Sequence, residues 1–141
     1  MAKRQALLTL EAALRIGCWY VLLKTLPFRW VATLQRRAVE ADANRSTAAD
    51  GELALVVRGA IRSATARLPF RTTCLMQALA AASMLRSRAA IYQLNIGADR
   101  NPTGAFEAHA WVESQGLVVA GEGDVGRYRV MLSLPERGSR K

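Results

Sequence analysis

Two side chains of this sequence could together perform nucleophilic chemistry: the thiol of Cys74 and the imidazole of His109, the only histidine in the chain. A cysteine thiolate is a strong nucleophile, and a neighbouring imidazole can take the thiol proton and later return it to a leaving group. The pair therefore indicates covalent catalysis by a cysteine, provided that the fold brings residues 74 and 109 together.

The residues around Cys74 place it at the start of a helix. Residues 74–86 contain almost no charge, which is typical of a helix buried in the middle of a domain. Thr72 or Thr73 could cap that helix. In its first turn, free backbone N–H groups and the helix dipole favour an anion, whether a thiolate or the oxyanion of an acyl-transfer intermediate. A single free cysteine is more often a buried structural residue, so the pairing with a histidine carries the argument.

A third, acidic group is expected to orient the histidine ring. The candidates are Glu122 and Asp124, which follow a strand predicted at residues 117–120. If that strand pairs antiparallel with the strand of His109, the loop after it returns toward the histidine. Glu113 lies four residues beyond His109 on the same strand face, roughly 13 Å away at about 3.3 Å per residue, so it is poorly placed.

The elements that must position these groups follow from hydrophobic spacing. Four helices are predicted, at residues 5–26, 28–41, 52–68 and 74–86. From residue 90 the period changes to two, which indicates strands at 90–97, 106–113, 117–120 and, on a sheet edge, 128–132. Helices followed by an antiparallel sheet predict an α+β fold, with N-terminal helices and a buried central helix that begins at the cysteine.

The chain divides into a helical preface at residues 1–50, a catalytic core at 51–135 and a charged tail at 136–141. An apolar repeat marks the first helix: Leu7, Leu10, Leu14, Cys18, Val21 and Leu22. Aromatic residues of the preface are Trp19, Tyr20, Phe28 and Trp30. They either pack in the core or form a docking face for a partner or a membrane surface. The apolar segment 16–23 is shorter than the roughly 20 residues that span a bilayer.

Composition limits the classes of function. The net charge of +9 attracts anions, such as nucleic acid, acidic lipid or an acidic peptide. No basic–aromatic strand pattern supports nucleic-acid binding, and one histidine with two distant cysteines gives no metal-ligand spacing. Glycines 121 and 123 lack the following helix of a phosphate loop, so no cofactor is expected. The two cysteines form no disulfide framework, which favours a cytoplasmic protein with reduced thiols.

The sequence resembles the leader peptidases of lasso peptide biosynthesis, a family among the transglutaminase-like, papain-related cysteine proteases. Two blocks carry the resemblance: Arg-Leu-Pro-Phe-Arg-Thr-Thr-Cys-Leu at residues 67–75, and Phe-Glu-Ala-His-Ala-Trp-Val-Glu at residues 106–113. Shorter matches are Ala-Leu-Ala at 78–80, Leu-Asn-Ile-Gly at 94–97 and Gly116.

The resemblance implies that Cys74 is the nucleophile and His109 the base. The family's third member is an Asp shortly after the strand that follows the histidine. Gly121 stands where that Asp is expected, so Glu122 or Asp124 must substitute for it.

The resemblance also implies a substrate and partners. The family removes the leader from a ribosomally made precursor peptide, and a separate ATP-dependent cyclase then closes the macrolactam. Some members carry a fused leader-recognition domain. This chain is too short to hold one, so it resembles the split form that works with a separate recognition protein. Two alternatives remain: an acyltransferase with the same Cys–His dyad, and a non-catalytic basic scaffold that binds an acidic peptide or an anionic membrane.

Overall fold

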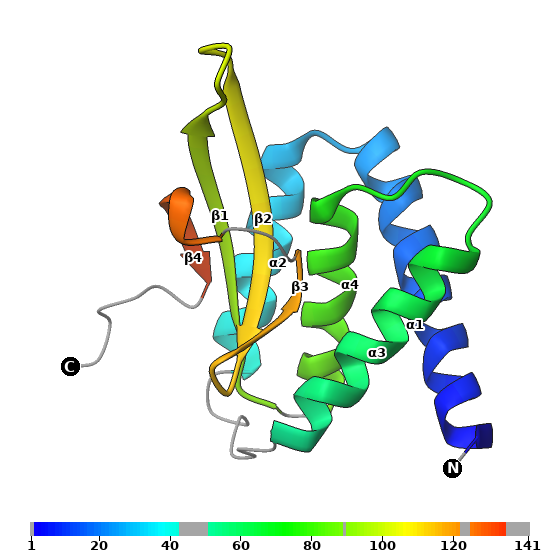
Figure 1. The fold of residues 1–141 in the computed structure, drawn as a ribbon. Coiled ribbons are helices and arrows are strands. Elements are labelled where there is room, and N and C mark those ends of the chain that lie inside the picture. The colour runs from blue at the N-terminus through cyan, green and yellow to red at the C-terminus, as the bar shows by residue number, and fades with distance from the viewer. Residues whose placement is uncertain (1, 43–50, 89, 122–124, 135–141) are drawn as a thin grey trace.

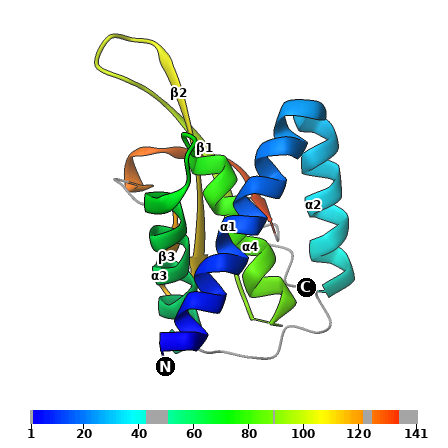
Figure 2. The same ribbon diagram turned by 90° about the vertical axis from the view of Figure 1, so that its right-hand side faces the viewer.

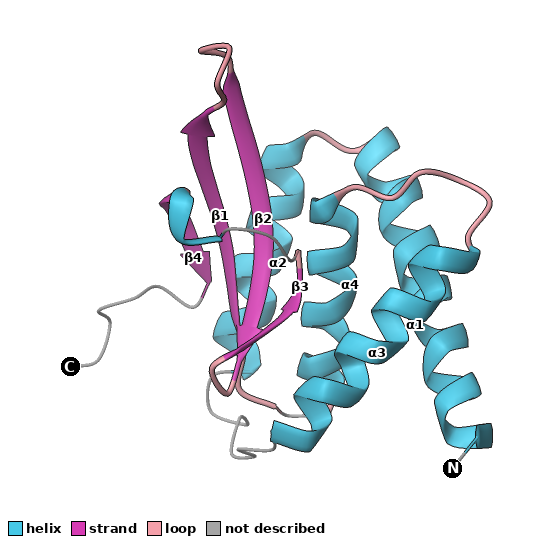
Figure 3. Cartoon of the chain, viewed as in Figure 1, coloured by secondary structure: helices cyan, strands magenta, loops and turns pink. Residues whose placement is uncertain are grey.

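The structure, a computed structural model, describes residues 2–42, 51–88, 90–121 and 125–134. Its elements are α1 (Ala2–Thr25), α2 (Phe28–Asp42), α3 (Gly51–Arg67), α4 (Cys74–Ser87), β1 (Gln93–Arg100), β2 (Phe106–Ser114), β3 (Leu117–Ala120), the short 3₁₀ helix η1 (Val125–Arg127) and β4 (Arg129–Leu134). Helices precede a four-stranded antiparallel sheet, which confirms the predicted α+β fold (Figures 1 and 3). Residues 43–50, at the end of the predicted preface, and the charged tail at 136–141 lie outside the described residues.

The sheet has the strand order β3-β2-β1-β4, so β4 lies on an edge as predicted. β1 was expected at residues 90–97, but it begins at Gln93 and continues to Arg100, which is opposite Phe106 in β2. The long hairpin of β1 and β2 extends past the helices (Figure 2). Gln115 and Gly116 both have positive φ, at 54° and 77°, as a tight two-residue turn between β2 and β3 requires.

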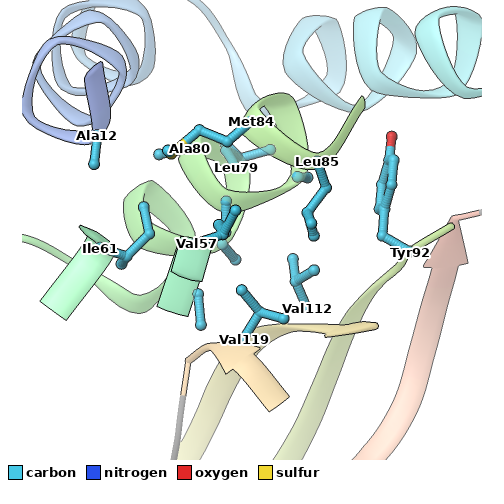
Figure 4. Packing of buried hydrophobic residues seen from close by; sticks show 14 of the residues in the cluster. Ala12, Val57, Ile61, Leu79, Ala80, Met84, Leu85, Tyr92, Val112 and Val119 are labelled. Atoms are coloured by element: carbon cyan, nitrogen blue, oxygen red, sulfur yellow. The ribbon is translucent and has the colours of Figure 1, made fainter. Parts of the chain in front are cut away.

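Helix α4 lies at the centre of the hydrophobic core, as its uncharged sequence predicts. Its residues from Ala78 to Leu85 are all buried. Val57 and Ile61 of α3 contact the core from one side, and Val112 and Val119 of the sheet point toward it from another (Figure 4). Side chains of α1 and α2 belong to the same core cluster. This packing holds the first residue of α4, Cys74, in a fixed place relative to β2 and β3.

The apolar repeat of α1 forms a helix as predicted, but it does not form the buried face. Leu7, Leu10, Leu14 and Val21 are 67%, 56%, 66% and 57% exposed, and Cys18 is exposed as well. The buried residues of α1 are instead Leu8, Thr9, Ala12 and Ile16. Because α1 carries apolar residues on two opposite sides, spacing alone could not tell the core face from the outer face.

The structure also corrects the length of the apolar segment in α1. Taken over Ala2–Thr25, this helix is long and apolar enough to cross a membrane by length and composition. The apolar segment 16–23 considered above begins directly after Arg15. Arg15 donates to Glu11 one turn earlier, and the helix continues through the pair. A helix that packs on a protein core passes the same test, so the finding does not make α1 a membrane span.

Glu11 links α1 to the end of α4 through Arg88. The Arg88 guanidinium donates to both carboxylate oxygens of Glu11, at 3.0 and 2.6 Å, and Arg15 donates to the same carboxylate at 2.9 Å. These hydrogen bonds, chiefly the one from Arg88, hold the pKa of Glu11 below its usual value. A carboxyl with a lowered pKa in the folded state stabilises the fold above its usual pKa and loses that contribution as pH falls through the folded value.

We expect Glu11→Gln to lower the free energy of unfolding by about 1 kcal/mol at neutral pH, because it removes a partly buried bidentate ion pair. The difference from the wild type should narrow as the pH falls from about 4 through the lowered pKa of the folded state, below which Glu11 is neutral in both the folded and the unfolded protein. Urea denaturation at several pH values measures it. Glu107→Gln, at a more exposed ion pair, is the control and should change less. A difference that is constant with pH would contradict this assignment.

Candidate active site

Cys74 is the first residue of α4, and its side chain is half-buried. Thr73 caps the helix: its hydroxyl accepts the N–H of Met76 at 3.2 Å. Of the two threonines that could have done so, Thr72 instead accepts a hydrogen bond from the amide of Gln77 at 2.9 Å. The two threonines precede Cys74, and their hydrogen bonds to Met76 and Gln77 join them to the residues that follow it. The sequence Thr-Thr-Cys thus helps to hold Cys74 at the start of α4.

The first turn of α4 offers hydrogen-bond donors beside the thiol. The first N–H groups of a helix have no intrahelical acceptor. Thr73 takes the N–H of Met76, and the N–H groups of Cys74 and Leu75 remain available to an anion at the helix start. An oxygen that becomes negative when Cys74 attacks a carbonyl would lie near these donors.

His109 lies on β2, and its ring is held by a backbone carbonyl. Nε2 of His109 lies 2.6 Å from the carbonyl oxygen of Gly121. Because a carbonyl oxygen only accepts, Nε2 carries the proton and donates it. In the neutral ring, Nδ1 is then the nitrogen with the free lone pair, so it is the atom that can accept a proton.

Aromatic rings fix the plane of the His109 ring. The Tyr128 ring stacks on it at 5.0 Å between centroids, and the Trp111 ring lies at 5.9 Å on the same strand face. The Trp111 indole N–H donates to Glu113 at 3.2 Å. Glu113 therefore orients the tryptophan, consistent with its poor placement for the histidine.

Arg127 attaches the segment before Tyr128 to the β1–β2 hairpin. Its guanidinium donates to Asp99 of β1 at 2.9 Å and to Glu107 of β2 at 2.8 Å. It also lies over the Tyr128 ring, with its guanidinium carbon 5.2 Å from the ring centre. Residue spacing does not predict this arrangement, because its members lie 20 to 28 residues apart along the chain.

Gly121 stands at the position where the resemblance implies an Asp, and the structure explains why a glycine is there. Its φ is +77°, and a Cβ at this position would lie 2.1 Å from the carbonyl oxygen of Ala110. No side chain fits in this backbone conformation, so the group that residue 121 presents to His109 is its own carbonyl. The predicted third members, Glu122 and Asp124, lie outside the described residues.

A cleft of about 270 Å³ lies between α3, α4 and β3. It is lined by Ile61, Arg62, Gln77, Val119, Ala120 and Gly121. Gln77 is one helical turn beyond Cys74, and the Gly121 carbonyl binds His109. The cleft thus reaches from the second turn of α4 to Gly121, whose carbonyl binds the His109 ring.

The structure places Cys74 and His109 on elements that pack together, α4 and β2, but among the described residues no hydrogen bond joins the two side chains. Ala110 and Val112 face the core around α4, so alternation along the strand places His109 on the other side, where its ring meets Gly121 at the strand edge. A direct contact between Cys74 and His109 is therefore part of the proposal below, in which substrate binding brings the two side chains together.

No group of three His, Cys, Asp or Glu side chains that could hold a metal ion gathers within the ranges that the structure describes. The polar groups near Cys74 and His109 are backbone N–H groups and an amide, which donate, and a carbonyl, which accepts. These are groups that can orient a peptide and stabilise an oxyanion.

Comparison with protein families agrees with the arrangement of these elements. A family model described as the transglutaminase-like superfamily matches residues 22–133, which include Cys74, His109 and Gly121. Members of this superfamily are typically cysteine proteases or acyltransferases. Comparison with curated proteins and with solved structures gives no significant match. With four-fifths of its length matched by the family model, the chain belongs to the transglutaminase-like superfamily.

Proposed function

We propose that this protein is a cysteine peptidase that removes the leader from a ribosomally made lasso-peptide precursor. The observation that carries the proposal is the hydrogen bond between His109 Nε2 and the Gly121 carbonyl, because it leaves Nδ1 as a base in a superfamily whose chemistry is acyl transfer from a cysteine. The lasso substrate rests on the resemblance of the two sequence blocks around Cys74 and His109.

In the proposed mechanism, His109 Nδ1 takes the proton of the Cys74 thiol, and the thiolate attacks the carbonyl carbon at the leader–core junction. The backbone N–H groups of Cys74 and Leu75 stabilise the oxyanion. His109 then gives its proton to the departing amine of the core peptide, and the C–N bond breaks. Water, deprotonated by His109, attacks the leader thioester, the C–S bond breaks, and the leader leaves as a carboxylic acid.

The third catalytic group is part of this proposal. The carbonyl of Gly121 sets the tautomer of His109 but carries no full charge, so it stabilises an imidazolium less than a carboxylate does. Glu122 or Asp124 is the proposed source of that charge, since they follow Gly121 by one and three residues along the chain. Glu122→Gln and Asp124→Asn should differ in their effect on turnover, the larger loss marking the third member.

The proposal includes two partners. A separate leader-recognition protein holds the leader, and a cyclase closes the macrolactam on the released core peptide. Precursor peptide, recognition protein and this enzyme should meet in the cytoplasm, where the precursor is made and thiols stay reduced.

An acyltransferase with the same dyad is the second candidate, because the superfamily includes both activities. Product mass distinguishes the two. With the precursor and the recognition protein, a peptidase gives the free leader acid, whereas a transferase gives a leader amide joined to an added amine. Detection of only the amide adduct would overturn the peptidase assignment. Formation of neither product by the wild-type protein would exclude both activities and favour a non-catalytic basic scaffold.

A further inference from the structure

The outer face of α1 is an apolar strip with cations at both ends. The strip consists of Leu7, Leu10, Leu14 and Val21, each more than half exposed. It lies on the side of the helix opposite the buried residues Leu8, Thr9, Ala12 and Ile16. In Figure 2, α1 lies at the front of the molecule, with α3 and α4 behind it. Contiguous exposed apolar surface of this kind marks a site of interaction.

The charged residues in the middle of α1 flank this strip and are engaged in ion pairs. Glu11 and Arg15 pair with each other, and Glu11 also pairs with Arg88 at the end of α4. Cations outside these ion pairs stand at the two ends of the helix: Lys3 and Arg4 in its first turn and Lys24 in its last, all exposed. The strip between Lys3 and Lys24 is therefore uncharged over most of a helix about 36 Å long at 1.5 Å per residue.

This distribution of charge determines the kind of partner. A second copy of the chain would bring like charges together, because in either orientation each helix end carries a lysine. A partner with negative charge along a broad, apolar surface fits both features: leucines enter the boundary between headgroups and acyl chains, and lysines reach the phosphates. The net charge of +9 adds long-range attraction to such a surface.

We propose that α1 lies flat on an anionic lipid surface, with Leu7, Leu10, Leu14 and Val21 inserted and Lys3 and Lys24 at the headgroups. The inner face of α1 stays on the protein core, so the helix lies in the interface and does not span the bilayer. This binding is independent of the proposed peptidase activity, since α1 carries neither Cys74 nor His109.

Cosedimentation with vesicles tests this proposal. The wild-type chain should bind vesicles of mixed phosphatidylglycerol and phosphatidylcholine, bind pure phosphatidylcholine vesicles far more weakly, and be released by high salt. Leu14→Glu, and Val21→Glu as a second variant, should weaken binding about tenfold or more, because each puts a charge in the apolar boundary. Met131→Glu is the matched control: Met131 is 70% exposed, like Leu14 at 66%, but lies on β4.

The charge contribution has its own control. Lys3→Gln combined with Lys24→Gln should weaken binding by about fivefold for each lysine. Arg100→Gln combined with Arg129→Gln removes the same charge from the sheet and should change binding less. Equal binding to neutral and anionic vesicles, or unchanged binding by Leu14→Glu and Val21→Glu, would overturn the proposal. So would a dimer, or a complex with the purified recognition protein, that forms without lipid and is broken by Leu14→Glu.

Discussion

Cys74→Ala is expected to reduce cleavage of the precursor on the order of 10⁴-fold or more, because it removes the only atom that forms the covalent intermediate. The fold should persist, since the side chain is half-buried at a helix start and alanine is well tolerated there. Cleavage is measured by mass spectrometry with the recognition protein present, and far-UV circular dichroism monitors the fold.

Cys18→Ala is the matched control for this experiment. Cys18 is the other cysteine of the chain, and it is exposed on α1. The Cys18→Ala variant should cleave the precursor at the wild-type rate. If Cys74→Ala also retains that rate, the reaction does not proceed through this thiol and the mechanism is wrong.

Gly121→Ala is expected to damage both the fold and the activity. A Cβ at residue 121 would lie 2.1 Å from the Ala110 carbonyl oxygen, at a φ of +77° that side chains rarely adopt. The backbone must move, and the carbonyl that holds His109 moves with it. We expect a loss of about 3 kcal/mol or more in the free energy of unfolding, from left-handed strain plus steric overlap.

Gly116→Ala separates the two causes of this loss. Gly116 has the same φ of +77°, but nothing lies within 4 Å of its Cβ position. It should cost about 1–2 kcal/mol, the contribution of φ alone, and leave turnover unchanged. Urea denaturation gives the stabilities, and turnover is compared at a temperature where both variants are folded. Equal losses of stability and of turnover in the two variants would mean that the contact between Gly121 and β2 has no special role.

The elements of this fold were predictable because their apolar residues repeat with clear periods. The uncharged sequence of α4 predicted its central position, and Thr-Thr-Cys predicted the start of the helix at Cys74. The face of α1 was not predictable. Leu7, Leu10 and Leu14 follow helical spacing as well as the buried residues do, and only the position of α3 and α4 decides which side is covered.

The candidate site was predictable only where side chains carry the chemistry. Cys74 and His109 could be named from residue type and position, whereas the acceptor on the histidine ring is a backbone carbonyl. Every residue has such a carbonyl, so no residue type signals it. The one available clue was a glycine at the position of an expected Asp, and the close approach to Ala110 shows why only a glycine fits there.

The reactivity of the two thiols within one molecule tests the central claim most directly. Cys18 is exposed and Cys74 is half-buried, so accessibility alone would make Cys18 react faster with iodoacetamide at neutral pH. If Cys74 is an activated nucleophile, peptide mapping should show it alkylated at least about tenfold faster than Cys18, with that advantage lost in His109→Ala. Slower labelling of Cys74, or labelling that does not respond to His109→Ala, would contradict the assignment of these residues as a catalytic dyad.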